Sequence, residues 1–261
     1  MKNKEIKLSL CGCFGRMGQI VIEEAKNFHD IKINSGIDRS GRKNELFPVF
    51  DCAENINNEC DVILDFSHPS ALESILNFSV KNKNSIVICT TGYNGCQLDI
   101  IKRFSDEIPI FLSSNTSIGI SVLTNIAKIA KDILGEDFDI EIIEKHHNKK
   151  LDAPSGTALM IANAIADDSS EFVYERHSRR QKRSKNEIGI HSVRCGGIMG
   201  EHEIIFASEN EYLNFKHCLN SRKVLAKGAL EAVRFVFEKK PGLYSMNDLL
   251  EWKKNKMSVH V

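Results

Sequence analysis

Through its first 112 residues the chain alternates short apolar runs with helical patterns, and few folds accommodate that order. The apolar runs read as strands at 6–10, 31–37, 61–66, 85–89 and 108–112. Strands that alternate with helices pair side by side in parallel, because each helix carries the chain back to the starting edge of the sheet. The sequence therefore predicts an α/β unit with a parallel sheet, and ligands over the edge where the strands end.

The first strand leads directly into the glycine-rich turn Gly12-Cys13-Phe14-Gly15-Arg16-Met17-Gly18, and a helical pattern through Ile20 and Ala25 follows. Strand, glycine turn and helix form the arrangement that binds the pyrophosphate of a dinucleotide. The spacing is GxxGxxG, which matches the general GxGxxG fingerprint only partly. The prediction of a dinucleotide site therefore depends on the context of the turn.

The second strand ends at Asp38 and Arg39, at the distance from the glycine turn where an acid commonly binds a ribose. Asp38 can accept a hydrogen bond from a ribose 2′-OH, and Arg39 can meet a 2′-phosphate. The pair predicts NADH or NADPH as the cofactor. A polar turn without a binding role is the alternative.

Composition excludes several other classes of protein. The 261 residues include 35 basic and 35 acidic side chains, and this balance gives no general attraction to nucleic acid or to anionic membranes. No apolar run approaches the ~20 residues that cross a bilayer, and the basic start runs into the glycine turn rather than into a cleavage site. We expect a cytoplasmic protein that binds neither nucleic acid nor membrane, with its eight cysteines reduced and mostly buried.

The stretch Asp139–Ala158, DIEIIEKHHNKKLDAPSGTA, concentrates the reactive side chains. Its first six residues alternate as in a half-buried strand, and Asp152–Thr157 carries the signals of a helix start. Two imidazoles and two lysines lie between them. Because the free N–H groups of a helix start attract anions, the stretch predicts a pocket for a small substrate with carboxylates, beside groups that can donate protons.

Two other interpretations fit parts of this stretch. Adjacent histidines on an extended segment point to opposite faces, so His146 and His147 are poorly placed to share a metal ion, and we predict no metal site. A solvated basic turn without a role is the other interpretation. The capped helix start directly behind the turn argues against it.

The rest of the second half predicts a helix over Ser117–Leu134 and a second sheet, antiparallel or mixed. Its strands are expected near Ile140 and at 188–194, 201–207 and 212–217. The run Arg176–Lys185 has six basic residues in ten and reads as a mobile, solvated loop. RNA binding is the alternative for this run, but it lacks the interleaved aromatic residues that stack on bases.

The segment Glu141–Ala158 resembles the E-[LI]-[IV]-E-x-H-H-x-x-K-x-D-A-P-S-G-T-A signature of the 4-hydroxy-tetrahydrodipicolinate reductase family, also called dihydrodipicolinate reductase. Further matches cover nearly the whole chain: G-x-x-G-R-M-G at 12–18, D-F-[ST] at 65–67, T-T-G at 90–92, N-x-S-x-G at 115–119, R-x-G-x-x-x-G-E-H at 194–202 and G-L-[FY]-x-M-x-D-[VL]-L at 242–250. The resemblance implies reduction of 4-hydroxy-tetrahydrodipicolinate to tetrahydrodipicolinate by NADH or NADPH, on the diaminopimelate route to lysine.

The resemblance also implies two domains. Residues 1–116 and 221–261 would form a Rossmann-like dinucleotide-binding domain with a parallel sheet. Residues 117–220 would form an α+β domain with a mixed sheet, which binds the substrate and joins four copies into a homotetramer. The strands at 188–194, 201–207 and 212–217 would leave one face and the edges of the second sheet uncovered by their own chain, and contact with other copies would cover them.

Roles for single residues follow from the resemblance and from their chemistry. His146 and Lys150 would donate protons, while His147, Gly156 and Thr157 would hold the carboxylates. The predicted cofactor contacts are Gly12, Cys13, Phe14, Gly15, Arg16, Met17, Asp38, Arg39, Cys89, Thr90, Thr91, Ser113, Ser114, Asn115 and Thr116. Cys89 replaces the glycine common in the family, and a side chain there could crowd the nicotinamide.

Two competing functions fit parts of the sequence. A dinucleotide sensor without turnover would keep the fold, but intact His146 and Lys150 argue against it. A semialdehyde dehydrogenase would need a nucleophilic cysteine in the second domain, where only Cys195 and Cys218 lie. We expect a reductase that uses both NADH and NADPH, because Asp38 suits a free ribose while neighbouring arginines suit a phosphate.

Overall fold

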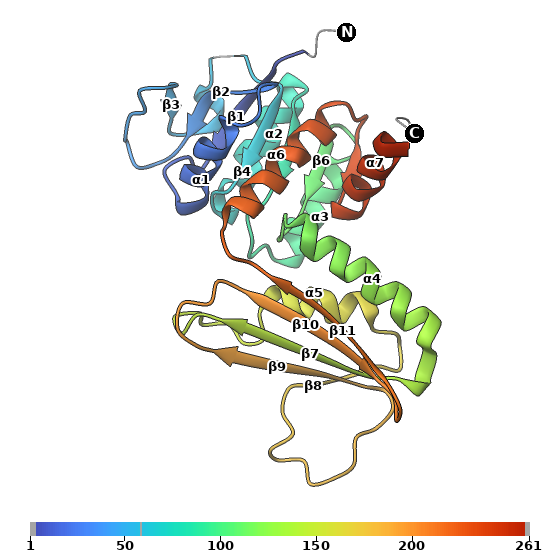
Figure 1. Ribbon diagram of the computed structural model, residues 1–261. Coiled ribbons are helices and arrows are strands. Elements are labelled where there is room, and N and C mark those ends of the chain that lie inside the picture. The colour runs from blue at the N-terminus through green and yellow to red at the C-terminus, as the bar shows by residue number, and fades with distance from the viewer. Residues whose placement is uncertain (1–3, 58, 259–261) are drawn as a thin grey trace. The chain divides into compact units, whose positions relative to one another are not determined.

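The computed structural model describes residues 4–57 and 59–258, and these fold into two compact units (Figure 1). The first unit comprises the chain up to residue 118 and from residue 222 onward, and the second comprises residues 119–221. The sequence places the divisions after residues 116 and 220 instead. Residues 1–3, 58 and 259–261 of the predicted first domain lie outside the described residues.

The first unit contains a sheet of seven strands, all paired in parallel. The strands are β1 (Ile6–Cys11), β2 (Ile31–Ile37), β3 (Val49–Phe50), β4 (Val62–Asp65), β5 (Ser85–Ile88), β6 (Pro109–Leu112) and β12 (Gly242–Tyr244), in the order β12-β6-β5-β4-β1-β2-β3. The predicted Rossmann-like parallel sheet is confirmed. The order reverses between β1 and β4, and sheets of this type bind ligands beyond the strand ends at such a point.

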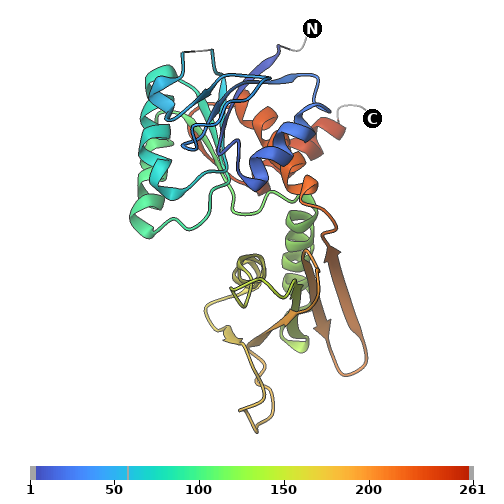
Figure 2. The ribbon, with the colours of Figure 1, turned by 90° about the vertical axis from the view of Figure 1, so that its left-hand side faces the viewer.

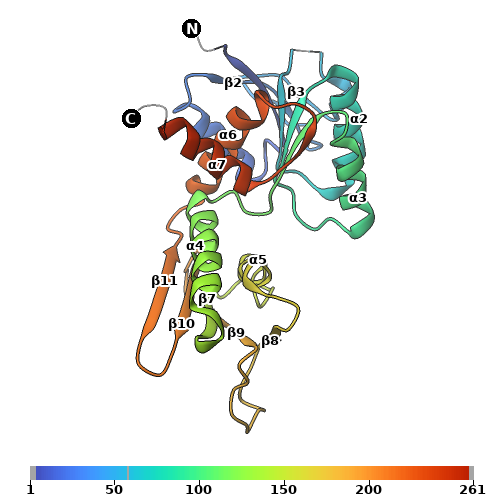
Figure 3. The ribbon, with the colours of Figure 1, turned by 90° about the vertical axis from the view of Figure 1, so that its right-hand side faces the viewer.

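Helices cover both faces of this sheet (Figures 2 and 3). They are α1 (Arg16–Ala25), α2 (Leu72–Asn82), α3 (Gly95–Phe104), α6 (Lys223–Phe237) and α7 (Met246–Ser258), with short 3-10 turns at Ala53–Asn55 and Pro69–Ala71. Neighbouring residues of a strand point to opposite faces of the sheet and pack in different hydrophobic cores. In β4, Leu64 packs with α1 and α6, whereas Ile63 packs with α2 and α3. Because both faces are buried, the strands read as continuous apolar runs.

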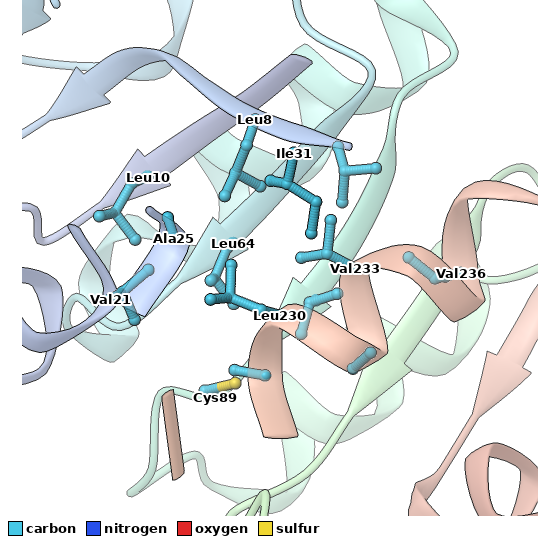
Figure 4. Packing of buried hydrophobic residues seen from close by; sticks show 14 of the residues in the cluster. Leu8, Leu10, Val21, Ala25, Ile31, Leu64, Cys89, Leu230, Val233 and Val236 are labelled. Carbon is cyan, nitrogen blue, oxygen red and sulfur yellow. The ribbon is translucent and has the colours of Figure 1, made fainter. Parts of the chain in front are cut away.

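Figure 4 shows the core on the α1 and α6 side, where Leu8 and Leu64 of the sheet meet Leu230 and Val233 of α6. The start of α6 lies very close to the segment after β6. A Cβ atom built on Gly228 would lie 1.8 Å from the backbone oxygen of Thr116. The Thr116 hydroxyl donates a hydrogen bond to the Leu225 oxygen at 2.7 Å, so only glycine at position 228 allows this packing.

The second unit contains the predicted mixed sheet, but with five strands instead of the four that the sequence predicts. They are β7 (Asp139–His146), β8 (Glu171–Val173), β9 (Glu187–Arg194), β10 (Glu201–Ala207) and β11 (Tyr212–Cys218), in the order β11-β10-β7-β9-β8. Strands β7, β9 and β8 pair in parallel, and β10 pairs antiparallel with β7 and β11. Helices α4 (Ile118–Leu134) and α5 (Gly156–Ile165) pack on one face of this sheet, and a 3-10 turn at Gly135–Asp137 follows α4.

The basic run 176–185 differs from the freely solvated loop that the sequence predicts. Arg176 pairs with Glu187, and Arg179 pairs with Glu171 at 2.9 Å. Arg183 donates to Asp139 at 2.7 Å and to Glu141 at 3.1 Å. Glu171 of β8 and Glu187 of β9 flank the run in sequence, whereas Asp139 and Glu141 of β7 lie 44 and 42 residues before Arg183. The sequence of the run therefore shows its basic residues but not the ion pairs that fix their side chains to the sheet.

The cysteines are free thiols, but the prediction that most of them are buried was wrong. Three are buried and two partly buried, and the exposed ones are Cys96, Cys195 and Cys218. These three lie at the start of α3, just after β9 and at the end of β11, where the chain leaves the cores. No helix among residues 4–57 and 59–258 is long and apolar enough to cross a membrane.

Candidate active site

The glycine turn after β1 forms a close-packed cradle at the start of α1. Gly12 has φ +72°, and a Cβ atom there would lie 2.6 Å from the Phe66 oxygen. A Cβ atom on Gly18 would lie 2.2 Å from the Gly12 oxygen. Gly15 precedes α1 with no side-chain cap, so the first N–H groups of this helix stay open to a ligand. The cradle fits the pyrophosphate of a dinucleotide, because that group binds to exposed N–H groups at a helix start.

A cavity of about 470 Å³ lies beside this cradle. Of the predicted cofactor contacts, Gly12, Gly15, Asp38 and Arg39 line it. The same cavity is also lined by residues that the sequence did not single out as contacts, among them Asp51, Cys52, His68, Ser70 and Ser74. The other predicted contacts lie outside this lining.

The carboxylate of Asp38 is held in place at the cavity wall. One oxygen accepts from the Phe14 N–H at 3.1 Å, and the other accepts from the Ser40 N–H at 2.9 Å. Burial opposes ionisation here, but the bonds from Ser40 and Phe14 and the nearby Arg42 guanidinium lower the pKa of Asp38 below its usual value. Asp38 is therefore ionised near neutral pH and can accept a hydrogen bond from a ribose hydroxyl.

The remaining predicted cofactor contacts follow β5 and β6. Ser113 donates its hydroxyl to the Asn115 oxygen at 2.8 Å, and the Asn115 side chain accepts from the Ser117 N–H at 2.9 Å. Thr91 and Ser114 are exposed, whereas Thr90 and Thr116 are buried.

Cys89 lies in the apolar core beside α6 and is only 7% exposed (Figure 4). Its thiol packs among aliphatic side chains of the sheet and the helix. The core thus accommodates the side chain at the position where the family commonly has glycine, and the crowding of the nicotinamide stays a prediction.

In the second unit, β7 directs four residues toward the helices. Ile140, Ile142, Glu144 and His146 alternate as buried positions along this strand. Glu144 is fully buried, and its carboxylate accepts bonds from the His146 Nδ1 at 2.5 Å and from Arg194 at 2.7 and 2.9 Å. Burial acts to raise the pKa of Glu144, but the bonds from His146 and Arg194 outweigh it and keep this pKa well below its usual value.

The other predicted substrate residues lie in the loop after β7 and at the start of α5. Lys150 forms an ion pair with Asp152 at 2.9 Å, and the Lys150 N–H donates to the His147 oxygen at 3.1 Å. Gly156 and Thr157 lie in the first turn of α5. A Cβ atom built on Gly156 would meet no other atom within 4 Å.

A hydrogen bond from the Ser155 N–H to Glu144, at 3.1 Å, ties the start of α5 to β7. Ser155 also caps α5, because its hydroxyl accepts from the Ala158 N–H at 3.1 Å. The structure thus brings one predicted proton donor, His146, and the predicted anion-binding helix start together around one buried carboxylate.

His202 of β10 completes the cluster. Its Nε2 lies 3.1 Å from the Ser155 hydroxyl, and its ring lies edge-on to the His146 ring at 5.3 Å between centroids. Burial, together with the charge on His146, lowers the pKa of His202 to about 4. His202 is therefore neutral near neutral pH and adds no positive charge beside His146.

Sequence reasoning gave no role to Glu144, Arg194 or His202. A signal for Glu144 was present, because the alternation in β7 puts it on the same face as Ile140 and Ile142. A carboxylate on a buried face needs partners. Among the described residues, no group of three histidine, cysteine or acidic side chains is arranged to hold a metal ion.

A parallel sheet with a dinucleotide cradle, in one chain with a cluster of basic groups and proton donors, defines an oxidoreductase that uses a nicotinamide dinucleotide. The family model described as "Dihydrodipicolinate reductase, N-terminus" matches residues 6–116, and "Dihydrodipicolinate reductase, C-terminus" matches residues 119–250. The chain belongs to the dihydrodipicolinate reductase family.

Individual relatives agree with this assignment. The chain is 47% identical to the 4-hydroxy-tetrahydrodipicolinate reductase of Clostridium tetani, over 94% of this chain and 97% of the relative. It is 45% identical to that of Clostridium novyi, over 95% and 99%. Among solved structures, the dipicolinate-bound dihydrodipicolinate reductase of Paenisporosarcina sp. TG-14 aligns with a TM-score of 0.78 and 25% identity, over 92% of this chain and 97% of that one. The chain is an enzyme of the reduction step in diaminopimelate and lysine biosynthesis.

Proposed function

We propose that this enzyme reduces 4-hydroxy-tetrahydrodipicolinate to tetrahydrodipicolinate with NADH or NADPH. One hydride and one proton are consumed, and one water and the oxidised cofactor are released. The observation that carries the proposal is the cluster around Glu144, where His146 and a helix start meet in a chain of this family.

The first unit supplies the cofactor site in this proposal. A nicotinamide cofactor delivers the hydride when it is bound. The open N–H groups at the start of α1 would hold its pyrophosphate, and Asp38 would accept from the ribose 2′-OH of NADH. Arg39 and Arg16, both exposed, would meet the 2′-phosphate of NADPH. These groups support use of both cofactors.

The second unit supplies the substrate site. Dipicolinate, which is bound in the Paenisporosarcina structure, is a planar dicarboxylate. We infer that the substrate of the present enzyme is also a dicarboxylate and is held through its carboxylates. The first turn of α5 would bind one carboxylate through the Gly156 and Thr157 N–H groups and the Thr157 hydroxyl. The buried Nδ1 of His147 makes no hydrogen bond to any residue that the structure describes, which supports a contact to substrate.

His146 and Lys150 would supply protons in the reaction. Departure of the hydroxyl as water needs a proton, and the same elimination releases one from the neighbouring ring carbon. Reduction of the ring then leaves electron density that a second proton must neutralise, so that one proton is consumed overall. His146 is anchored through Nδ1, and Lys150 is paired with Asp152 in the same loop. Two positioned acids therefore suit the two protonation events, and their positive charges favour a dicarboxylate.

The experiment is an assay of the purified protein with chemically or enzymatically generated 4-hydroxy-tetrahydrodipicolinate, with NADH and NADPH in separate reactions. We expect reduced cofactor to be consumed only when the substrate is present, and mass spectrometry to find tetrahydrodipicolinate. Absence of turnover with both cofactors would refute the proposal. A cytoplasmic location and a homotetrameric assembly are further proposals, and the assembly is argued in the Discussion.

A further inference from the structure

We propose that Glu144 is a positioning residue for catalysis: its buried carboxylate fixes the ring of His146 with Nε2 toward the substrate and fixes the start of α5 beside it. The inference rests on the proposed function, since it assumes that His146 donates a proton. It adds a residue that touches neither substrate nor cofactor and acts through the groups that do.

The protonation state of His146 at Nδ1 follows from its contact with Glu144. A carboxylate can only accept hydrogen bonds, and Arg194 keeps the Glu144 carboxylate ionised by donating to both of its oxygens. The Nδ1 atom of His146, 2.5 Å away, must therefore carry a hydrogen. Nδ1 keeps this hydrogen throughout the reaction, and Nε2 is the atom that gives a proton to the substrate and later regains one from water.

Gly200 leaves space on the opposite edge of the His146 ring. A Cβ atom built on Gly200 would lie 3.1 Å from the Nε2 of His146 and 3.5 Å from its Cδ2. A side chain at position 200 would therefore press on this edge of the ring. The ring is held by an acid at Nδ1, and glycine at position 200 keeps a side chain away from Nε2.

Glu144 also links proton donation to substrate binding. The carboxylate oxygen that accepts from Arg194 at 2.7 Å also accepts from the Ser155 N–H at 3.1 Å. Ser155 is the residue directly before α5, so its position sets the direction of the first turn. Arg194 in turn donates to the Asp152 oxygen at 2.6 Å, within the loop between β7 and α5. One carboxylate thus fixes the geometry of both groups that the proposed reaction needs.

The strand offers a matched control on its other face. Glu141 pairs with the Nε2 of His191 at 2.7 Å, but both side chains lie on the face of the sheet opposite α4 and α5. A Glu141→Gln variant therefore removes a similar carboxylate–imidazole contact from the same strand without touching the proposed site. We expect it to keep the wild-type kcat.

The test compares Glu144→Gln with Glu141→Gln in the full-length enzyme. Glutamine has one accepting oxygen, and its NH₂ group can only donate. This group would face the N–H groups of Arg194 or His146, so at least one of their hydrogen bonds to residue 144 is lost. We expect Glu144→Gln to lower kcat by at least about 10-fold, up to the about 10²–10⁴ that loss of a general acid costs. We also expect the solvent deuterium isotope effect on kcat to rise, because proton donation becomes slower relative to hydride transfer. The dissociation constant for NADH should not change.

Each outcome decides the inference. Wild-type kcat in a folded Glu144→Gln variant would overturn it, and so would a lower kcat with an unchanged solvent isotope effect, because a purely structural role slows all steps. If Glu144→Gln does not fold, Glu144→Asp decides, since it keeps a carboxylate but draws it back from the Nδ1 of His146 and the N–H of Ser155. It should lower kcat and raise the solvent isotope effect, and an unchanged kcat would overturn the inference.

The His146→Gln variant separates this inference from the proposed function. If His146→Gln keeps full activity, the assignment of the proton donor itself fails. If His146→Gln is slow but Glu144→Gln is as fast as the wild type, only the positioning role fails.

Discussion

At the scale of single residues, Asp38 is placed to set the preference between the two cofactors. Its ionised carboxylate attracts a ribose 2′-OH and repels a 2′-phosphate, while Arg39 beside it does the opposite. We expect kcat/KM for NADH and NADPH to differ by less than about tenfold, which corresponds to about 1.4 kcal/mol. Asp38→Ala should shift this ratio toward NADPH.

The control for this prediction is Asp38→Asn, because an asparagine oxygen can still accept from the Phe14 N–H. Both variants remove the negative charge, but only the alanine variant also loosens the glycine turn. Initial rates at varied NADH and NADPH give the ratio. An equal loss for both cofactors in both variants would show that Asp38 does not contact the ribose.

Also at this scale, His202 makes the stability of the fold depend on pH. Its pKa is lowered to about 4 in the folded protein from the usual 6.5, so between these values the unfolded chain binds more protons. Stability is then fully present above about pH 6.5 and falls as the pH drops toward 4. From pH 7 to pH 5 we expect a loss of about 2 kcal/mol from this group.

Urea unfolding of wild type and His202→Gln at these two pH values tests the prediction. The variant should lose less stability on acidification, since glutamine does not titrate. An identical pH dependence in the two proteins would show that His202 is not the group responsible.

The sequence predicted His146, His147 and Lys150 as neighbours in one loop because they are adjacent in the chain. It missed the partners that orient them, since Arg194 and His202 come from strands about fifty residues further on. Only the pairing of β7 with β9 and β10 brings these side chains to Glu144. Local patterns identify reactive groups, while the contacts that position them depend on the register of the sheet.

At the scale of secondary structure elements, the close approach of α6 to the segment after β6 depends on Gly228. A methyl group there would lie 1.8 Å from the Thr116 oxygen, so Gly228→Ala must push the helix or the segment away. We expect a loss of about 1–3 kcal/mol, as for other overpacked sites. Gly95→Ala on α3 is the control, since a Cβ atom there meets no neighbour within 4 Å.

Thermal or urea unfolding of the two glycine variants measures this effect. Gly95→Ala should leave stability within about 0.5 kcal/mol of the wild type, as for a surface substitution. Equal stability of Gly228→Ala and Gly95→Ala would contradict the packing described for α6.

Helices and strands with a clear hydrophobic pattern were predicted to within a few residues, whereas very short strands were not predicted. β2 and β10 have the expected bounds, because an apolar or alternating run of seven residues is a clear strand signal. The strands β3, with two residues, and β8, with three, were missed. Segments this short carry no periodicity and exist only because a neighbouring strand offers hydrogen-bonding groups.

At the scale of the whole molecule, we predict a homotetramer joined through the sheets of the second units. Helices α4 and α5 cover one face of this sheet. The opposite face carries Ile143, exposed Val193 and exposed Tyr212 among charged residues. The exposed Val193 and Tyr212 side chains suit contact with other copies, since grouped apolar side chains on a surface often mark an interface.

Light scattering at micromolar concentration tests this assembly, and a monomeric mass would contradict it. Val193→Glu should reduce the mass without unfolding the chain, because Val193 is exposed within its own unit. The comparison is Ile133→Glu on the exposed face of α4, where Ile133 is 77% exposed. Dissociation by Ile133→Glu but not by Val193→Glu would assign the interface to the helix instead of the sheet.

The central claim is that the end of β7 and the loop after it supply protons to the reduction, and kinetics of Lys150→Ala test it most directly. The measurement is steady-state consumption of NADH with 4-hydroxy-tetrahydrodipicolinate, with circular dichroism to confirm folding and His146→Gln as a companion variant. The account predicts a kcat lower by about 10²–10⁴ in each variant with NADH binding preserved, and a double variant little worse than the poorer single one. A folded Lys150→Ala enzyme with a kcat near that of the wild type would contradict it.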